Sequence, residues 1–275
     1  MVTASWPTVS PMGAEEKFGR GADEWLSGLG LVRDAVRQEL VHRQLLAHLP
    51  QVEGPLRVLD AGCGQGTQAI ALARLGHEVV GLDVSGKLLH EARRSAAEEP
   101  TTVRRRLCFV SGDLLALGDE HTGSYDVVCC HGVAMYLPSL DEAIAALCAT
   151  CRPDGLLSVL TRNRAGIAMR AGMTGDWVGA IEAFDARHYR NRLGIEAVRA
   201  DEPEEVQAAL TGRGAYAVAW YGVRLFTDHW GPERPGPGFA ELLAAEEEAG
   251  RRDPYRSLAA LTHTIARLNG RANGH

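Results

Sequence analysis

The sequence predicts an α/β protein built on an open, doubly wound sheet. Between about Leu56 and Leu160, short apolar runs alternate with stretches of helical periodicity, as in successive βα units on a parallel sheet. A glycine-rich segment, Asp60–Gly66, joins the first apolar run to the first helical stretch. An acidic residue, Asp83, ends the second apolar run. Together these features predict a ligand site at the carboxyl edge of the sheet.

The elements of this core follow from apolar periodicity and from the turn residues between the runs. Strands are expected at Arg57–Asp60, His77–Asp83, Leu107–Gly112, Tyr125–His131 and Leu156–Thr161. Helices are expected at Thr67–Leu75, Lys87–Glu99 and Leu140–Cys151.

Segments on either side of the core complete the expected organisation. Asp34–His48 is typical of an amphipathic helix and is expected to cover the sheet or the site. Residues 163–199 break the βα rhythm and are interpreted as a lid or substrate-side insertion. Beyond them we expect a helix at Glu204–Leu210, a strand-like run at Tyr216–Phe226, a loop at Gly231–Gly238 and a helix from Phe239. The domain division is therefore a helical cover (1–50), a ligand-binding core (51–161) and a substrate lobe completing the sheet (162–275).

Composition narrows the class of protein. The 275 residues are 45% hydrophobic, which is enough for a full core. With 29 Lys and Arg against 35 Asp and Glu, the net charge is −6, which argues against an evenly basic coat for nucleic acid but permits a local basic patch. No run is long enough to cross a membrane, and Met1–Ala14 lacks the features of a signal peptide, so a cytoplasmic protein is expected. The six cysteines are expected to be reduced and mostly buried, with no metal site.

The glycine-rich turn carries the strongest functional signal. Glycines after a strand let a ligand approach the backbone, and the carboxylate of Asp83 can accept hydrogen bonds from both hydroxyls of a ribose. A nucleoside-like ligand is therefore expected. The glycines follow a GxGxG pattern and Thr67 occupies the position of the last glycine in GxGxxG, so a dinucleotide fits less well.

The segment from Asp60 to Gly66 resembles the first motif of class I S-adenosylmethionine-dependent methyltransferases, acidic-x-Gly-x-Gly-x-Gly. The resemblance covers about Leu56 to Leu160 and implies a Rossmann-like sheet with S-adenosylmethionine as cofactor. It implies that Gly62 and Gly64 contact the methionine part and Asp83 the ribose. The Ser111–Asp113 turn is implied at the adenine edge. The implied cofactor residues are Arg37, Asp60, Gly62, Gly64, Gly66, Asp83, Val84, Gly112, Asp113 and His131.

A closer resemblance extends over most of the chain. The sequence is similar to bacterial tRNA methyltransferases that esterify the carboxylate of 5-carboxymethoxyuridine at the wobble position. The matching stretches are Glu16–Phe18, Val36–Gln38, Val58–Ile70, Arg74–His77, the His131 segment, Asn163–Gly175, Gly222–Phe226 and Asp253–Tyr255. The resemblance implies that Arg37 holds the carboxylate of the cofactor, that His131 lies beside the cofactor, and that Arg224 and Tyr255 lie near the substrate.

Two departures from that family concern the acceptor. The family carries a lysine run after the insertion, where this chain has Arg187–Arg192 in an acidic context. Since tRNA binding draws on many phosphate contacts, this substitute is weaker. The chain also has Thr227 where the family has a histidine.

The chemistry of the acceptor decides which residues are needed. A carboxylate acceptor is ionised at neutral pH and needs cationic anchors such as Arg224, whereas an alcohol or phenol needs a general base, for which His131 is the candidate. His131 is equally well interpreted as a residue that only packs at the cofactor. Further substrate-side candidates are Arg162, Asn163 and Arg164, which follow the fifth strand, with Tyr221 and Tyr255.

The sequence thus predicts an enzyme that O-methylates either a tRNA carboxylate or a small-molecule acid or alcohol of a biosynthetic pathway. The chain lacks an Asn/Asp-Pro-Pro-aromatic motif after the fourth strand and a Pro-Cys nucleophile, which disfavours methylation of a base amine or of cytosine carbon. A non-catalytic S-adenosylmethionine-binding protein remains an alternative, because the glycine turn explains binding only. A nicotinamide oxidoreductase would need a turn of different spacing.

Overall fold

The computed structural model describes residues 14–270, with side chains from residue 21 onward. The expectation about a signal peptide in Met1–Ala14 and the family-like side chains of Glu16–Phe18 therefore lie outside the described part. No described helix is long and apolar enough to cross a membrane. All six cysteines are unpaired, and only Cys108 is exposed, which confirms the expected reduced and mostly buried thiols.

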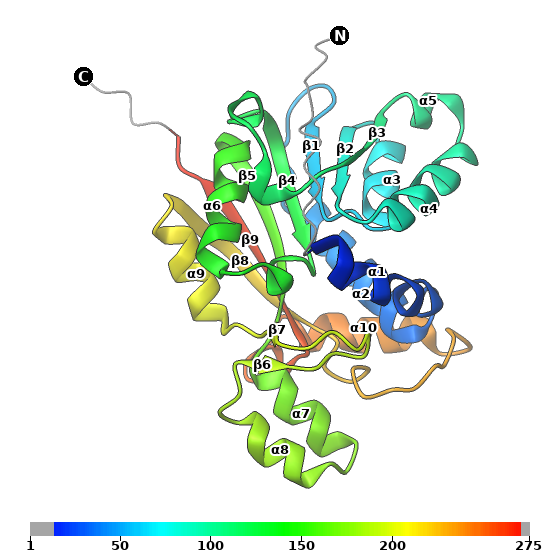
Figure 1. Cartoon of the computed structure of the whole chain (residues 1–275), viewed down its shortest axis with the longest axis vertical. Helices are drawn as coiled ribbons and strands as arrows, with labels where there is room; N and C mark the ends of the chain where they lie inside the picture. Colours follow the sequence, from blue (N-terminus) through cyan, green and yellow to red (C-terminus); the bar gives the residue numbers. More distant parts are fainter. Residues whose placement is uncertain (1–13, 271–275) are drawn as a thin grey trace.

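A seven-stranded sheet forms the centre of the molecule in the order β3-β2-β1-β4-β5-β9-β8 (Figure 1). Strands β1 to β5 are mutually parallel, and β9 runs antiparallel between β5 and β8. The strands span Arg57–Ala61 (β1), Glu78–Asp83 (β2), Leu107–Ser111 (β3), Tyr125–His131 (β4), Cys151–Arg162 (β5), Ala215–Val223 (β8) and Leu261–Leu268 (β9). The reversal of strand order beside β1 confirms the doubly wound sheet and puts a crevice at the carboxyl ends of β1 and β4.

Two strand boundaries differ from expectation. Strand β5 begins at Cys151 rather than Leu156, since Cys151 pairs with Tyr125 before a bulge. Strand β8 ends at Val223 because Arg224 adopts a left-handed backbone with φ +63°. Both changes lie at turns, where apolar periodicity gives no signal.

Strand β9 was not expected as an element, although the third segment was expected to complete the sheet. Its residues Leu261 to Ile265 are all buried, including the polar Thr262, His263 and Thr264. Because both faces of the strand are covered, polar and apolar residues do not alternate between solvent and core. The period of two that identifies a half-buried strand is therefore missing from this sequence.

Helices cover both faces of the sheet. They span Ala14–Ser27 (α1), Val32–Leu46 (α2), Thr67–Arg74 (α3), Gly86–Ala97 (α4), Thr101–Arg104 (α5), Leu140–Thr150 (α6), Ala165–Met173 (α7), Trp177–Ala183 (α8), Pro203–Thr211 (α9) and Phe239–Ala249 (α10). Helix α2 is the expected cover helix. The 163–199 insertion forms α7, α8 and a two-stranded ribbon of His188–Tyr189 (β6) and Val198–Arg199 (β7), and α7 and α8 project beyond the sheet (Figure 1).

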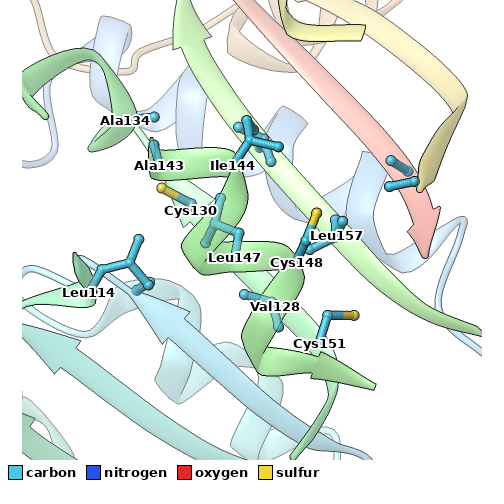
Figure 2. Packing of buried hydrophobic residues seen from close by; sticks show 14 of the residues in the cluster. Leu114, Val128, Cys130, Ala134, Ala143, Ile144, Leu147, Cys148, Cys151 and Leu157 are labelled. Carbon is cyan, nitrogen blue, oxygen red and sulfur yellow. The ribbon is translucent and has the colours of Figure 1, made fainter. Parts of the chain in front are cut away.

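The core on each face is apolar and fully enclosed. On one face, Ile144 and Leu147 of α6 pack over Val128 and Leu157 of the sheet, with no exposed surface (Figure 2). Each such side chain contributes roughly 1.5–3 kcal/mol by burial. The opposite face packs α2 and α3 against the other side of the same strands. The sheet is thus held rigidly between two layers, and its carboxyl edge is left to carry ligands.

A buried glutamate on α10 fixes the chain just after β8. Glu246 is 1% exposed. Its carboxylate accepts hydrogen bonds from the backbone amides of Leu225 (2.7 Å), Phe226 (3.1 Å) and Thr227 (2.9 Å), and from the Thr227 hydroxyl (2.6 Å). Thr227, which stands where the resembled family has a histidine, therefore helps to anchor this turn to α10. The anchored turn positions Arg224, which directly precedes it.

We expect Glu246→Gln to destabilise the protein by about 2–3 kcal/mol. The glutamine amide group would place N–H donors against the backbone N–H donors of residues 225–227, and the substitution removes the negative charge that these donors stabilise. Urea unfolding measures this change. Glu248→Gln, on the same helix but half exposed and paired only with Arg252, serves as the control and should change stability by less than about 0.5 kcal/mol. Equal effects of the two variants would contradict the anchoring role of Glu246.

Candidate functional site

Two adjoining cavities open at the carboxyl ends of β1, β2 and β4. The first, called the strand-edge cavity, has a volume of about 140 Å³, and the second, called the α2 cavity, about 340 Å³. Trp25, Gly62, Gly64 and His131 line both. Their combined volume lies within the range of roughly 300–1,000 Å³ that is usual for small-molecule sites. The two cavities therefore make one candidate site with two compartments.

The glycine turn after β1 forms the wall between the compartments. Gly62 has φ +75° and donates its amide to Leu82 O at 2.7 Å. A Cβ on Gly62 would lie 2.1 Å from Val133, and one on Gly66 would lie 2.9 Å from Phe109. These positions favour glycine, because each has a positive φ and any side chain there would have to displace the side chain of Val133 or Phe109. Gly66 packs against the protein in this way and is the one expected cofactor residue that lines neither cavity.

Asp83 ties the turn to the end of β2 inside the strand-edge cavity. Its Oδ2 accepts a hydrogen bond from the Gly64 amide and its Oδ1 one from the Ser85 amide, each at 2.8 Å. The side chain is nearly buried, and burial raises the pKa of its carboxyl. Val84, Gly112 and Asp113 line the same cavity, as expected for residues around a ribose and a base. A carboxylate has about four lone-pair sites, so Asp83 can accept a further hydrogen bond beside those from the backbone amides of Gly64, Ser85 and Val84.

Asp60 supplies an unsatisfied acceptor to the α2 cavity. It is 2% exposed, and its Oδ2 has no hydrogen-bond partner among the described residues. Burial, reinforced by repulsion from Asp83, raises the pKa of Asp60 to about 7. In the same cavity, Arg37 pairs with Asp34 at 3.0 Å and lies 4.9 Å from the ring centre of Trp25. The α2 cavity thus offers a buried carboxylate and a guanidinium, which suits a zwitterionic group.

A buried chain of hydrogen bonds leads from His131 away from the cavities. His131 Nε2 lies 2.8 Å from Ser158 Oγ, which lies 2.8 Å from His263 Nε2. His263 Nδ1 in turn lies 2.7 Å from Gln44 Oε1. Because Gln44 Oε1 only accepts, the proton of neutral His263 is on Nδ1, Ser158 donates to His263, and His131 Nε2 donates to Ser158. This chain leaves His131 Nδ1 unprotonated and without a partner among the described residues.

His131 is a poor base despite this lone pair. Burial, together with the charges of Arg37 and His42, lowers the pKa of His131 to about 3. An efficient general base has a pKa near the working pH. Of the two interpretations that the sequence left open, this low pKa favours a residue that only packs at the cofactor site over a residue that removes a proton.

A pair of arginines lies at the ends of β5 and β8. Arg224 Nη2 is 3.0 Å from Asp228 Oδ1, and Arg162 Nη1 is 3.2 Å from Asp228 Oδ2. The Arg162 and Arg224 side chains are 4% and 12% exposed. Burial alone raises the pKa of Asp228, but the charges of Arg224 and Arg162 outweigh it and hold this pKa well below its usual range. Arg162 and Arg224 line neither cavity, but Arg33, one turn before the cavity residue Arg37 on α2, contacts the same Asp228 at 3.5 Å.

Four other substrate-side candidates lie outside both cavities. The Asn163 amide group donates to the backbone oxygens of Ser257 and Ala259 and is buried. Arg164 pairs with Glu202 at 2.6 Å. Tyr221 and Tyr255 are also placed elsewhere: the Tyr221 hydroxyl bonds to His48 at 2.7 Å, and Tyr255 is 51% exposed on a short turn. The structure therefore joins Arg162 with Arg224 but does not bring these four together, and their substrate roles stay predictions.

Sequence reasoning missed several residues that shape the site. Trp25 of α1 lines both cavities and donates its Nε1 hydrogen to Gln65 at 2.7 Å. Residues 195–198 of the insertion line the strand-edge cavity from the opposite side. Both segments meet the core only through tertiary contacts, so no local pattern could have identified them. An isolated tryptophan in a helix is more often a packing residue.

Comparisons with known proteins agree with this geometry. The model of a family described as "Methyltransferase domain" matches residues 58–155. The tRNA 5-carboxymethoxyuridine methyltransferase of Escherichia coli K12 is 27% identical over 255 residues, covering 92% of this chain and 93% of that protein. The ubiquinone biosynthesis O-methyltransferase of Xanthomonas oryzae pv. oryzae is 32% identical over 182 residues, covering 64% and 72%.

Solved structures share the fold. Magnesium protoporphyrin IX methyltransferase from Synechocystis, solved with bound S-adenosylhomocysteine, superposes with a TM-score of 0.62 at 19% identity, covering 94% of this chain and all of that one. The [4+2]-cyclase SpnF superposes with a TM-score of 0.56 at 21% identity, covering 85% and 81%. Since these identities are low, the likeness supports the architecture and leaves the reaction to the site residues.

We expect Ser158→Ala to abolish the tautomer preference of His131, because the acceptor for the Nε2 proton is removed. In the unsubstituted protein, ¹⁵N NMR of labelled histidine should show His131 Nδ1 as unprotonated over the whole neutral range. Ser124→Ala, in the loop before β4 and outside this chain of bonds, is the control and should leave the signal unchanged. A protonated Nδ1 in the unsubstituted protein would show that the hydrogen bond is reversed, with Ser158 donating to His131 Nε2.

Proposed function

The chain belongs to the class I S-adenosylmethionine-dependent methyltransferases, and on this premise we propose that it methylates a carboxylate oxygen of an acidic acceptor. One observation carries the choice of acceptor: buried arginines lie at the carboxyl edge of the sheet that also carries the cavities, whereas His131, which lines both compartments, has a pKa of about 3. Such a site suits a nucleophile that is already ionised. It does not suit one that must first lose a proton.

The two compartments fit the cofactor. Asp83 has lone pairs free for the ribose hydroxyls, and Gly112 and Asp113 border the space for the base. In the α2 cavity, the orphaned Oδ2 of Asp60 suits the α-ammonium group and Arg37 suits the α-carboxylate. His131 Nδ1 is a further acceptor at the junction of the compartments. When bound, the cofactor supplies an electrophilic methyl group on a sulfonium.

Transfer to a carboxylate needs positioning more than acid–base chemistry. A new bond forms between a carboxylate oxygen and the methyl carbon while the carbon–sulfur bond breaks, giving a methyl ester and S-adenosylhomocysteine. A carboxylate with a pKa near 4 carries its negative charge at neutral pH, so no proton moves. The contribution of the protein is to hold the reacting atoms in line, which is worth several kcal/mol.

Arg224 and Arg162 are the proposed anchors of the acceptor carboxylate. Both are nearly buried at the carboxyl edge of the sheet, at the ends of β5 and β8. Arg224 has a left-handed backbone, a strained conformation that the Glu246 hydrogen bonds enforce and that is commonest at functional sites. The planar guanidinium can bind both oxygens of a carboxylate, which fixes its orientation.

The carboxylate of 5-carboxymethoxyuridine in tRNA is the first acceptor to test. The relative that acts on this nucleoside matches the chain over 92% of its length, including the segment of Arg224. A small-molecule acid or alcohol is the second candidate. It is favoured by the net charge of −6 and by the presence of only two lysines, because tRNA binding normally draws on many basic residues.

We expect affinity for S-adenosylhomocysteine to rise as the pH increases from 5.5 through about 7. Asp60 must ionise to pair with the ligand's ammonium, and its pKa in the free protein is about 7. Titration calorimetry across this range measures the effect, and Asp60→Asn should flatten it. Without ligand, the raised pKa means that Asp60 contributes stability below pH 4 that is lost as the pH rises through 7, so Asp60→Asn should be the more stable form at pH 8. The same pH slope in both proteins would exclude this role.

The proposed reaction is tested by transfer of a radiolabelled methyl group to total tRNA, from the source organism and from a strain that lacks the wobble methylation. Label on the deficient tRNA that mild alkali removes indicates an ester. Arg224→Ala should lower transfer about tenfold to a hundredfold while leaving S-adenosylhomocysteine affinity unchanged. Alkali-stable label would exclude a carboxylate acceptor, and absence of label with intact cofactor binding would favour a small-molecule acceptor. Equal loss of cofactor affinity in Arg224→Ala would refute its assignment to the acceptor.

A further inference from the structure

The charge around Asp228 is far from balanced. Five arginines, here called the arginine cluster, contact this one aspartate through its carboxylate or its backbone carbonyl: Arg33, Arg162, Arg170, Arg192 and Arg224. Five positive charges and one negative charge leave a net charge of +4. Among the main charges that act on the pKa values of Arg33, Arg170, Arg192 and Arg224, Asp228 is the only carboxylate in the described part of the chain.

Asp228 neutralises three of the five arginines poorly. These three, Arg33, Arg170 and Arg192, are called the outer arginines, and Arg162 and Arg224 are called the inner pair. Arg33 lies 3.5 Å from Asp228 Oδ1, and Arg170 lies 3.9 Å from Oδ2. The closest contacts of Arg170 and Arg192 are with backbone carbonyls, at 2.6 Å to Asp228 O and 3.1 Å to Trp230 O respectively. A carbonyl accepts a hydrogen bond but carries no net charge. The outer arginines therefore keep most of their positive charge uncompensated.

The crowding of positive charge contributes to lowered pKa values of two outer arginines. Burial, followed by the charge of Arg224, lowers the pKa of Arg33 to about 9. Burial, followed by the charge of Arg170, lowers the pKa of Arg192 to about 10. Like charges that are partly desolvated repel strongly, so a site of this kind is more stable with an anion bound. Other arginines of the same segments are paired with carboxylates, Arg43 with Glu39 at 2.8 Å and Arg187 with Glu205 at 2.6 Å.

We propose that Arg33, Arg170 and Arg192 bind a phosphoryl group of the acceptor, in addition to the carboxylate held by the inner pair. This inference rests on the proposed function, which assigns one negative charge to Arg162 and Arg224 and leaves +3 on the cluster. A phosphoryl group supplies one to two further charges and several acceptor oxygens for separate guanidinium groups. The exposed fractions fit this division, since Arg33 and Arg170 are 17% and 28% exposed and Arg162 is 4% exposed.

The cofactor is a less suitable source of this anion. The outer arginines are not among the residues that line either cavity, whereas Arg37 lies in the α2 cavity beside Asp60. The outer arginines come from α2, α7 and the loop after β6, so the segments that cover the acceptor side converge on them. An anion bound there would approach from solvent and extend inward to Arg224.

The test compares the thermal stability of the full chain, saturated with S-adenosylhomocysteine, in sodium phosphate and in sodium chloride of equal ionic strength. Phosphate should raise the melting temperature of the unsubstituted protein by about 2–4 °C. Arg33→Gln and Arg192→Gln should lose this gain, with phosphate affinity falling about tenfold in each. The matched controls are Arg43→Gln on the helix of Arg33 and Arg187→Gln in the insertion of Arg192, and both should keep the gain.

A second readout separates a binding site from a structural cluster. If the outer arginines repel one another, Arg33→Gln and Arg192→Gln should melt at a higher temperature than the unsubstituted protein in chloride alone, by about 2 °C. A structural network held by Asp228 would instead melt at a lower temperature in both variants. That result, or a phosphate effect no larger than that of chloride, or equal losses in the controls, would overturn the inference.

The source of the phosphoryl group is resolved by competition with phosphate. Uridine 5′-monophosphate, with uridine as its phosphate-free control, represents a small acceptor, and an anticodon stem-loop RNA represents tRNA. Competition by the RNA alone would identify a nucleic-acid backbone, and competition by the nucleotide a phosphorylated small molecule; failure of both to compete would overturn the inference. Because these measurements involve no methyl transfer, a phosphate site can be confirmed even if no carboxylate is methylated, and the converse also holds.

Discussion

The site depends on the hydrogen bonds that join the glycine turn after β1 to the end of β2. Leu82 O accepts from the Gly62 and Cys63 amides at 2.7 and 3.0 Å, and the Asp83 carboxylate accepts from the Gly64 amide. These bonds hold the turn open between two compartments instead of letting it collapse onto α3. Asp83 consequently braces the turn and also lines the strand-edge cavity. Its position cannot shift without changing both cavities.

The sequence predicted the parts of the fold that have a local period. Strands β1 to β4 and helices α3 and α6 lie within two residues of their expected bounds, since the sequence of each shows one apolar face or an apolar run between turn residues. Strand β9 has neither, because neighbouring strands and helices cover Thr262 to Thr264 on both faces. The antiparallel position of β9 between β5 and β8 is set by contacts with residues distant in the sequence. The sequence of the strand alone therefore does not reveal it.

The same distinction divides the candidate site. The predicted cofactor side lies in one contiguous turn and at neighbouring strand ends, so spacing and family resemblance together pointed to Asp60, Gly62, Gly64 and Asp83. The proposed acceptor side is assembled from Arg33, Arg162, Arg224 and Asp228, which are separated by up to 195 positions. The sequence suggested Arg224 only through family resemblance and Arg162 through its place after a strand. It gave no sign that the two share one carboxylate.

The two halves of the site carry unsatisfied charge of opposite sign, which has a consequence for turnover. Asp60 is buried and its Oδ2 has no hydrogen-bond partner in the described part of the chain, and the arginine cluster holds cations with too few anions. A cationic methyl donor suits the first half and an anionic acceptor the second. Methyl transfer to a carboxylate removes both charges at once, since the sulfonium becomes a thioether and the carboxylate a neutral ester. In the proposed reaction the methyl ester loses the charge that paired with Arg162 and Arg224, whereas S-adenosylhomocysteine keeps the ammonium group that pairs with Asp60, so the charge arrangement promotes release of the methylated acceptor.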